Sequence, residues 1–177
     1  RHLTELLRRS VAVERRGSPG MLAFHHALMR EAAYSTMLLR TRRQLHARLA
    51  EYLTDSAPDA VQDIAMHLLE AGEAARAFPY LIAAGAEASR AMALSDAIRL
   101  FSTALDHVPA EADTELVVKA HDGLGFAYSL VPDLTQSQAA YQRLVDYADQ
   151  SGRPFAKVTA LNRLAVATAI LSGDIQE

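Results

Sequence analysis

The sequence predicts an all-α fold, a right-handed stack of antiparallel helix pairs preceded by a short β-hairpin. Apolar residues recur at helical spacing over most of the 177 residues, and Gly, Pro and Asp gather in the gaps between these segments. Half of the chain is hydrophobic but only 6% is aromatic, because Ala and Leu supply the excess. Small side chains let helices pack closely, so the composition favours layered helices.

The N-terminal segment is the part of the chain with a strand pattern. Leucines within residues 3–7 have helical spacing and predict a short helix. Two β-prone runs at 11–15 and 21–24 then flank a turn with Gly and Pro at 16–20, which predicts a hairpin. A lone two-stranded hairpin is marginally stable in water, so we expect neighbouring helices to support it.

Helical periodicity dominates the rest of the chain. It predicts helices at 27–38, 41–54, 59–71, 73–91, 94–107, 113–130, 134–150 and 154–172. Asp59 and Asp133 stand where N-caps are expected, and Gly72 and Gly152 stand where helices should stop.

A constant interval links the later helices. The number of residues from Gly85 to Gly125 equals the number from Gly125 to Ala165. The same number separates Phe101 from Tyr141. We call this separation the repeat interval. Two helices approach closely where a Gly or Ala removes bulk, and an aromatic ring on the second helix can fill the space that remains. The interval therefore predicts repeated helix pairs, each of which leaves an apolar face for the next pair to cover.

The spacing inside one repeat interval resembles a tetratricopeptide repeat. The order of small, small, aromatic, small and helix-stopping residues is found at Gly85, Ala97, Phe101, Ala104 and Pro109. The next unit has Ser137 and Leu144 where the repeat has alanine. The resemblance implies a tetratricopeptide-like superhelix.

Two short segments near the N-terminus carry a second resemblance. The first reads F-x-H-x-L-x-R-E over residues 24–31 and continues as R-E-A-A-Y to Tyr34. The second reads R-R-x-L-H over residues 42–46. Together they resemble the end of the winged-helix domain in STAND-type signalling ATPases, the group that includes LuxR-type regulators of the MalT kind.

This resemblance implies a domain organisation and a role. Residues 1–40 would be the C-terminal remnant of a winged-helix domain, with the hairpin as its wing. Residues 41–177 would be a truncated tetratricopeptide-like sensor arm. An upstream nucleotide-binding domain of the parent would hold ATP or ADP, and the arm would couple nucleotide state to a protein, peptide or small inducer in its concave groove. Such parents are cytoplasmic, and many carry a LuxR-type DNA-binding domain or a nucleotide cyclase domain. DNA would be bound only by such a domain outside this chain.

The resemblance implies one specific cofactor contact. The segment from His26 to Glu31 resembles the M-H-D-L-L-R-E segment of nucleotide-switch ATPases, in which the His contacts the β-phosphate of ADP. An imidazole N–H can donate a charge-assisted hydrogen bond to a phosphate oxygen. Ala27 replaces the family's Asp, so any second contact from that position is lost. The alternative is that His26 caps or orients the start of the next helix.

Four further residues complete the match, and we expect them at the seam between the winged helix and the repeats. They are Arg30, Tyr34, Arg43 and His46. Arg30 and Tyr34 are four positions apart, and Arg43 and His46 are three apart, so each pair shares a helix face.

The repeat frame also predicts a partner groove. The first helix of each pair lines the concave side of such an array. This assigns to the groove Lys119, Asp122, Phe126, Asn162 and Val166. Three of these residues are polar where a packing face would be apolar. A solvated helix face gives the same pattern, so both interpretations stay open.

Catalysis and metal binding have little support in the sequence. No G-x-x-x-x-G-K-[ST], G-x-S-x-G or H-E-x-x-H motif occurs, so we assign no catalytic residue and expect no enzyme activity from this chain. Gly123 and Gly125 lie in a helical pattern and indicate close packing rather than a phosphate loop. The chain has no Cys and no His pair at i, i+4, and the side chains of His25 and His26 should diverge. We therefore expect no metal site. The sequence contains no run of about 18 apolar residues, so we predict no membrane-spanning helix.

Charge is divided unevenly along the chain. Residues 1–53 hold ten Arg and four Glu, a net charge of +6, whereas residues 54–177 have a net charge of −9. A basic segment can bind nucleic acid, but these arginines fall between apolar helical positions without an aromatic stacking pattern. We favour salt bridges and solvated helix faces, with direct nucleic-acid binding as an alternative.

The main alternative to a switch arm is a free-standing tetratricopeptide scaffold that binds protein without a nucleotide. Both hypotheses share the fold and differ over the role of His26. Self-association is also open, because the sequence does not fix the oligomeric state.

Overall fold

The computed structural model describes residues 2–14, 22–131 and 133–172. Within these residues, nine helices and one two-stranded antiparallel sheet form an all-α protein, as predicted. The chain divides into two compact units, residues 1–45 and 46–177. The division falls inside helix α3 (Leu39–Ser56).

The first unit contains the predicted hairpin. Strands β1 (Ala12–Glu14) and β2 (Leu22–Phe24) pair antiparallel, with Val13 opposite Ala23. The predicted turn at 16–20 lies outside the described residues. Helix α1 (His2–Arg8) contacts β1 and helix α2 (Ala27–Thr36) contacts β2, so each strand has a neighbouring helix, as expected. No described side chain of this unit is buried.

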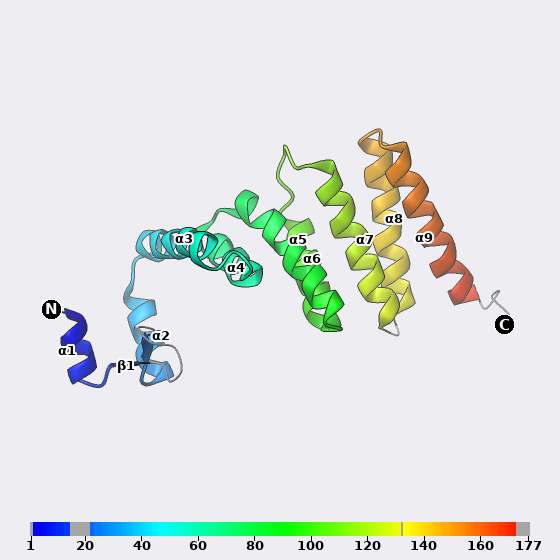
Figure 1. Cartoon of the computed structure of the whole chain (residues 1–177). Coiled ribbons are helices and arrows are strands. Elements are labelled where there is room, and N and C mark those ends of the chain that lie inside the picture. The colour runs from blue at the N-terminus through cyan, green and yellow to red at the C-terminus, as the bar shows by residue number, and fades with distance from the viewer. Residues whose placement is uncertain (1, 15–21, 132, 173–177) are drawn as a thin grey trace. The chain divides into compact units, whose positions relative to one another are not determined.

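The second unit continues from α3 as a series of helices that each pack against the next (Figure 1). They are α4 (Val61–Ala71), α5 (Ala74–Arg90), α6 (Leu94–Asp106), α7 (Thr114–Leu130), α8 (Leu134–Gln150) and α9 (Pro154–Ser172). Every predicted helix from residue 27 onward is present, and each end lies within two positions of the predicted one.

These helices share a common register. The start of α7 lies one repeat interval after the start of α5, and the start of α9 lies one further interval on. The starts of α6 and α8 are separated in the same way. The predicted glycine–aromatic contacts are confirmed. A Cβ atom added to Gly85 would lie 2.9 Å from the ring of Phe101, and one added to Gly125 would lie 2.6 Å from the ring of Tyr141.

Both glycines of α7 serve close packing, as expected. Gly125 receives the ring of Tyr141 from α8, and Gly123 faces the ring of Phe101 from α6. A Cβ atom at either position would overlap an aromatic ring. The two glycines therefore let α7 approach the helix before it and the helix after it.

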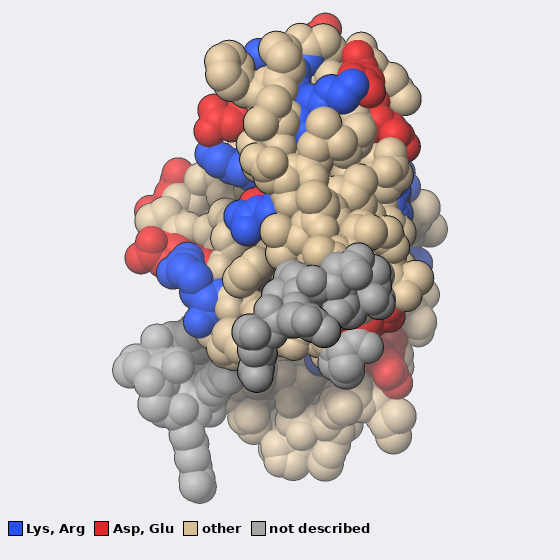
Figure 2. All heavy atoms as spheres, turned by 90° about the vertical axis from the view of Figure 1, so that its right-hand side faces the viewer, with Lys and Arg blue, Asp and Glu red and all other residues tan. Residues whose placement is uncertain are grey.

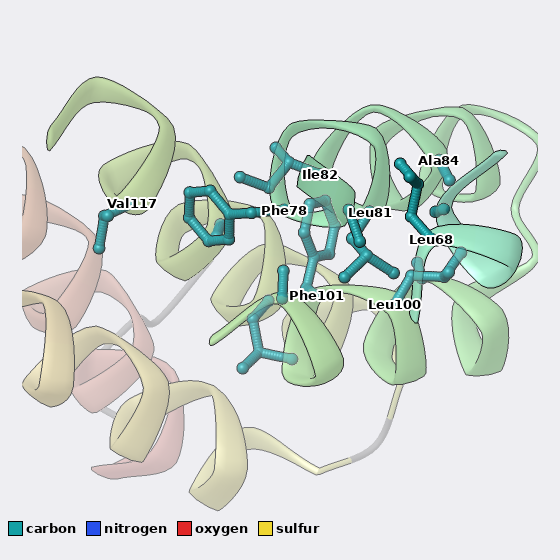
Figure 3. Packing of buried hydrophobic residues seen from close by; sticks show 14 of the residues in the cluster. Leu68, Phe78, Leu81, Ile82, Ala84, Leu100, Phe101 and Val117 are labelled. Carbon is teal, nitrogen blue, oxygen red and sulfur yellow. The ribbon is translucent and has the colours of Figure 1, made fainter. Parts of the chain in front are cut away.

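The core of the second unit lies between successive helices. Figure 3 shows Leu68 of α4, Phe78 and Leu81 of α5, and Leu100 and Phe101 of α6 packed together, all of them buried. Burial of such side chains stabilises each by about 1.5–3 kcal/mol. Repeated interfaces of this kind hold the series of helices together.

Both departures from the alanine pattern of the repeat are buried. Ser137 is fully buried, and its hydroxyl donates a hydrogen bond of 2.9 Å to the carbonyl of Gly125. Leu144 is also fully buried, in a second cluster with Val145 and Ala160. The serine thus adds a polar link between α8 and α7 at Gly125, the residue that the ring of Tyr141 contacts.

Helix ends follow the predicted residues with one exception. Gly72 and Gly152 take left-handed backbone conformations just after α4 and α8, as expected of helix stops. The side chain of Asp133 caps α8 by accepting a hydrogen bond from the backbone N–H of Gln136. The prediction for Asp59 is wrong. Ala60 is the N-cap of α4, because a turn through residues 57–60 delays the helix by one position.

Candidate functional site

His26 is the N-cap residue of α2 and is exposed. Its backbone is extended, with φ −127° and ψ 136°, and its carbonyl accepts hydrogen bonds from Met29 and Arg30. Its imidazole makes no capping hydrogen bond. His26 therefore occupies the N-cap position of α2, as the capping alternative requires. Its side chain, however, makes no hydrogen bond that would cap the helix.

The prediction that the side chains of His25 and His26 diverge is wrong. Their rings meet edge to face, with centroids 4.3 Å apart, and Nδ1 of His25 lies 2.9 Å from Nε2 of His26. The chain bends at these two residues between β2 and α2, so the alternation of a regular strand is not kept. Two neighbouring imidazoles on the surface form a small polar site at the start of α2.

The first unit brings one predicted seam residue to an unpredicted partner. The guanidinium carbon of Arg42 lies 5.0 Å from the ring centroid of Tyr34, a cation–π distance. Arg30 and Arg43 are both exposed. The structure thus places Arg42, rather than Arg43, over the tyrosine.

His46 belongs to the second unit and pairs with His67. The two Nδ1 atoms are 2.9 Å apart, which joins α3 to α4. Burial and the neighbouring His46 lower the pKa of His67, and the nearby carboxylates of Asp63 and Glu70 oppose this shift. Because one of two facing nitrogens must accept, the contact favours at least one neutral imidazole.

An open pocket of about 430 Å³ lies over α5 and α7. It contains three of the five predicted groove residues, Lys119, Asp122 and Phe126. A smaller pocket of about 200 Å³ adjoins it, because Phe126 and Arg163 line both. Val166 lines the smaller pocket, whereas Asn162 is exposed and lines neither.

We call these two pockets together the helix groove. Its residues come from the five successive helices α5 to α9. They are Ile82, Ala86, Ser89, Arg90, Phe101, Lys119, Asp122, Gly123, Phe126, Ser129, Leu134, Ser137, Tyr141, Arg163, Val166 and Ala167.

A polar cluster sits where the two pockets meet. Arg163 Nε of α9 lies 3.3 Å from Asp122 Oδ1 of α7, an ion pair without the geometry of a hydrogen bond. Burial raises the pKa of the Tyr141 phenol to about 12, and the Asp122 carboxylate adds to the rise while Arg163 opposes it. Side chains of three helices thus interact electrostatically within the groove.

Sequence reasoning missed the contribution of α5 to the groove. Ile82 and Ala86 stand one repeat interval before Asp122 and Phe126, so the interval could have identified them. No comparable pattern identifies the cations Arg90 and Arg163, because their counterparts at the same register are not basic.

A separate open pocket of about 630 Å³ lies between the start of α7 and the turn from α8 to α9. Phe155 on its edge is 89% exposed. Figure 2 looks onto the α9 side of this unit and shows a broad uncharged surface, with charged residues mostly toward its edges. Helix α9 therefore presents apolar side chains that no described residue covers, including Phe155, Val158 and Leu161.

Some basic residues of the N-terminal segment are paired. Arg8 and Arg9 both form ion pairs with Glu5, at 2.7 Å and 2.5 Å. These arginines, Arg8 first, hold the pKa of the Glu5 carboxyl below its ordinary value. The pairs reduce the positive charge available to a nucleic acid at this end of the chain.

Among the described residues, no three His, Asp or Glu side chains lie close enough together to hold a metal ion. None of the helices in the described ranges has the length and apolar character needed to cross a bilayer.

Comparison with protein-family models, with curated proteins and with solved structures found no match.

Proposed function

We propose that the chain is the sensor arm of a STAND-type signalling ATPase. In this proposal a tetratricopeptide-like array forms the arm, and it couples the nucleotide state of the parent to binding of a partner or inducer. The observation that carries the proposal is the shared register of α5, α7 and α9, because these three helices together line the helix groove.

The packing of the second unit supports the array. Gly85 receives Phe101 and Gly125 receives Tyr141, so two consecutive helix pairs use the same contact at the same register. Repetition of one interface produces an extended surface rather than a single closed core. Such surfaces suit binding to a partner along several helices.

The first unit supports the attachment to a nucleotide-binding module. A hairpin and then a helix with His26 at its N-cap follow the order that the resemblance implies. The imidazole of His26 is exposed beside the ring of His25, so a phosphate could approach it from solvent. Its proposed role is a hydrogen bond to the β-phosphate of ADP.

The test is the nucleotide content of the full-length parent protein. The protein is purified, denatured, and any released nucleotide is identified by chromatography, for the wild type, His26→Ala and the neighbouring His25→Ala. We expect stoichiometric ADP from the wild type and from His25→Ala, and loss of ADP from His26→Ala. Equal amounts of ADP in the wild type and both variants would contradict the proposed contact of His26. The absence of ADP from all three proteins would contradict the nucleotide switch itself.

A free-standing scaffold is the second candidate function. It is favoured by one observation, that the helix groove lies wholly within the second unit and needs no residue of the first. Absence of nucleotide from the purified parent, together with retained partner binding, would establish this alternative.

A further inference from the structure

We infer that the helix groove binds a small organic anion that carries an apolar ring or chain. The inference rests on the proposed function and names the ligand class for the same groove.

The first argument is the concentration of positive charge. Residues 46–177 hold nine Lys and Arg and eighteen Asp and Glu, so acids outnumber bases two to one. The larger pocket reverses this ratio, because Arg90, Lys119 and Arg163 line it with Asp122 as its one acid. Asp122 pairs with Arg163, whereas the carboxylates that pair with Arg90 and Lys119 belong to residues outside the pocket lining. An anion that enters the pocket therefore meets these two cations, while their glutamate partners stand outside the lining.

The second argument is that these cations can exchange their partners. Lys119 lies 2.8 Å from Glu115, and Arg90 lies 4.0 Å from Glu87. All four side chains are more than half exposed. Neither glutamate lines the groove. Exposed pairs of this kind contribute only about 0–1 kcal/mol, so an incoming carboxylate or sulfonate can replace a glutamate at little cost.

The third argument is the apolar floor with an unused hydroxyl. Phe101, Phe126 and Ile82 line the pocket together with the cations, and the absence of a side chain at Gly123 leaves room for the ring of Phe101. Ser89 lines the same pocket, and its Oγ is buried without a hydrogen-bond partner among the described residues. Apolar walls with a few convergent polar groups are typical of small-molecule sites, and a volume of about 430 Å³ lies in their usual range.

The pocket of about 630 Å³ beside the turn from α8 to α9 lacks this combination. Its charged residues are Asp113, Glu115 and Arg153, so acids predominate. It therefore serves as an internal comparison for an apolar site without excess positive charge.

The experiment uses two fluorescent probes with the same ring system. These are 8-anilinonaphthalene-1-sulfonate, which is an anion, and N-phenyl-1-naphthylamine, which lacks the sulfonate. Each is titrated into the chain and into four variants whose folding is checked by circular dichroism. Lys119→Glu and Phe126→Ala alter the groove. Lys157→Glu and Phe155→Ala are the matched controls, because neither Lys157 nor Phe155 lines the groove.

We expect the anion to bind more tightly than the uncharged probe. Lys119→Glu should lower the affinity for the anion about tenfold, since the substitution changes the charge near the ligand by two units. It should leave the affinity for the uncharged probe unchanged. Phe126→Ala should lower the affinity for both probes, and the two control variants should change neither affinity. Equal affinity of the two probes, with sensitivity to Phe126→Ala alone, would overturn the anion inference and leave the groove as a ligand site. If Phe155→Ala weakens binding of the probes and Phe126→Ala does not, the helix groove is not the binding surface. That result would also remove the site on which the proposed function rests.

Discussion

His121 is a buried titratable side chain on the face of α7 that packs against α8. Its ring centroid lies 6.0 Å from that of Tyr147, and its Nδ1 is buried without a hydrogen-bond partner among the described residues. Burial, with a smaller contribution from Arg143, lowers its pKa from 6.5 to about 4. The neutral imidazole is therefore the form that the folded protein accommodates.

As the pH is lowered, His121 becomes protonated at a higher pH in the unfolded chain than in the folded protein. The contribution of the neutral His121 side chain to the free energy of unfolding is fully present above pH 6.5 and is lost as the pH falls toward 4. The loss amounts to about 3 kcal/mol. We predict that His121→Leu, the residue found at position 161 of the same register, removes this loss. Urea unfolding of both proteins between pH 7.5 and 4.5 measures it, and parallel pH profiles would show that His121 is not responsible.

Met92 shows what residue type alone does not reveal. It has a φ of 58° after α5, the left-handed conformation that Gly72 and Gly152 adopt after α4 and α8. In each case the following N–H bonds a carbonyl five positions earlier, as in a Schellman motif. The two glycines could be predicted as helix stops. A methionine carries no such preference, and its conformation is imposed by the short connection between α5 and α6.

At the scale of the helix pair, the contact between Gly125 and Tyr141 sets how closely α7 and α8 approach. An alanine at 125 would gain about 1 kcal/mol of helix propensity. Its methyl would overlap the tyrosine ring, which is itself buried. Overpacking of this kind costs about 1–3 kcal/mol, so the overlap outweighs the gain in propensity.

We predict that Gly125→Ala destabilises the wild-type chain by up to about 2 kcal/mol, the cost of overpacking less the gain in helix propensity. In the background of Tyr141→Leu the same change should be neutral or stabilising, because the ring that it meets is gone. Chemical denaturation of the four members of this double-mutant cycle gives the coupling energy. A coupling near zero would mean that the two residues do not limit the approach of the helices.

At the scale of the whole molecule, the second unit is a series in which each helix relies chiefly on its neighbours. Helices α5 and α6 have neighbours on both sides, whereas α9 packs on α8 and α7 and leaves apolar side chains exposed. In such a series, stability is a sum of local interfaces, and segments at an end open most readily.

We predict that amide hydrogen exchange is slowest in α5 and α6 and faster in α9. Peptide-resolved exchange followed by mass spectrometry under native conditions measures the difference. Equal protection along the whole unit would instead indicate that it opens only by global unfolding.

The positions of the helices could be predicted because local sequence determines them. Pro109, Gly152 and similar residues interrupt the apolar periodicity, and no distant contact is needed to interpret them. Contacts across space were harder to predict. Nothing in the sequence pairs His46 with His67 or chooses Arg42 over Arg43 as the partner of Tyr34, because those choices depend on how the helices are oriented.

The candidate site was partly accessible from the sequence for the same reason. The repeat interval assigns positions to helix faces, and three residues that it groups, Lys119, Asp122 and Phe126, line one pocket. It does not say which long side chain reaches a given pocket. Asn162 therefore lies outside the groove while its neighbour Arg163 enters it.

The common register of the helices also has a genetic consequence. Because α5, α7 and α9 begin at a constant interval, a duplication or deletion of the codons for one interval would add or remove one helix pair in frame. The junctions between glycine and aromatic ring would be regenerated at each boundary. The series of helices could thus lengthen or shorten between related genes by unequal recombination, without a new packing solution at any step.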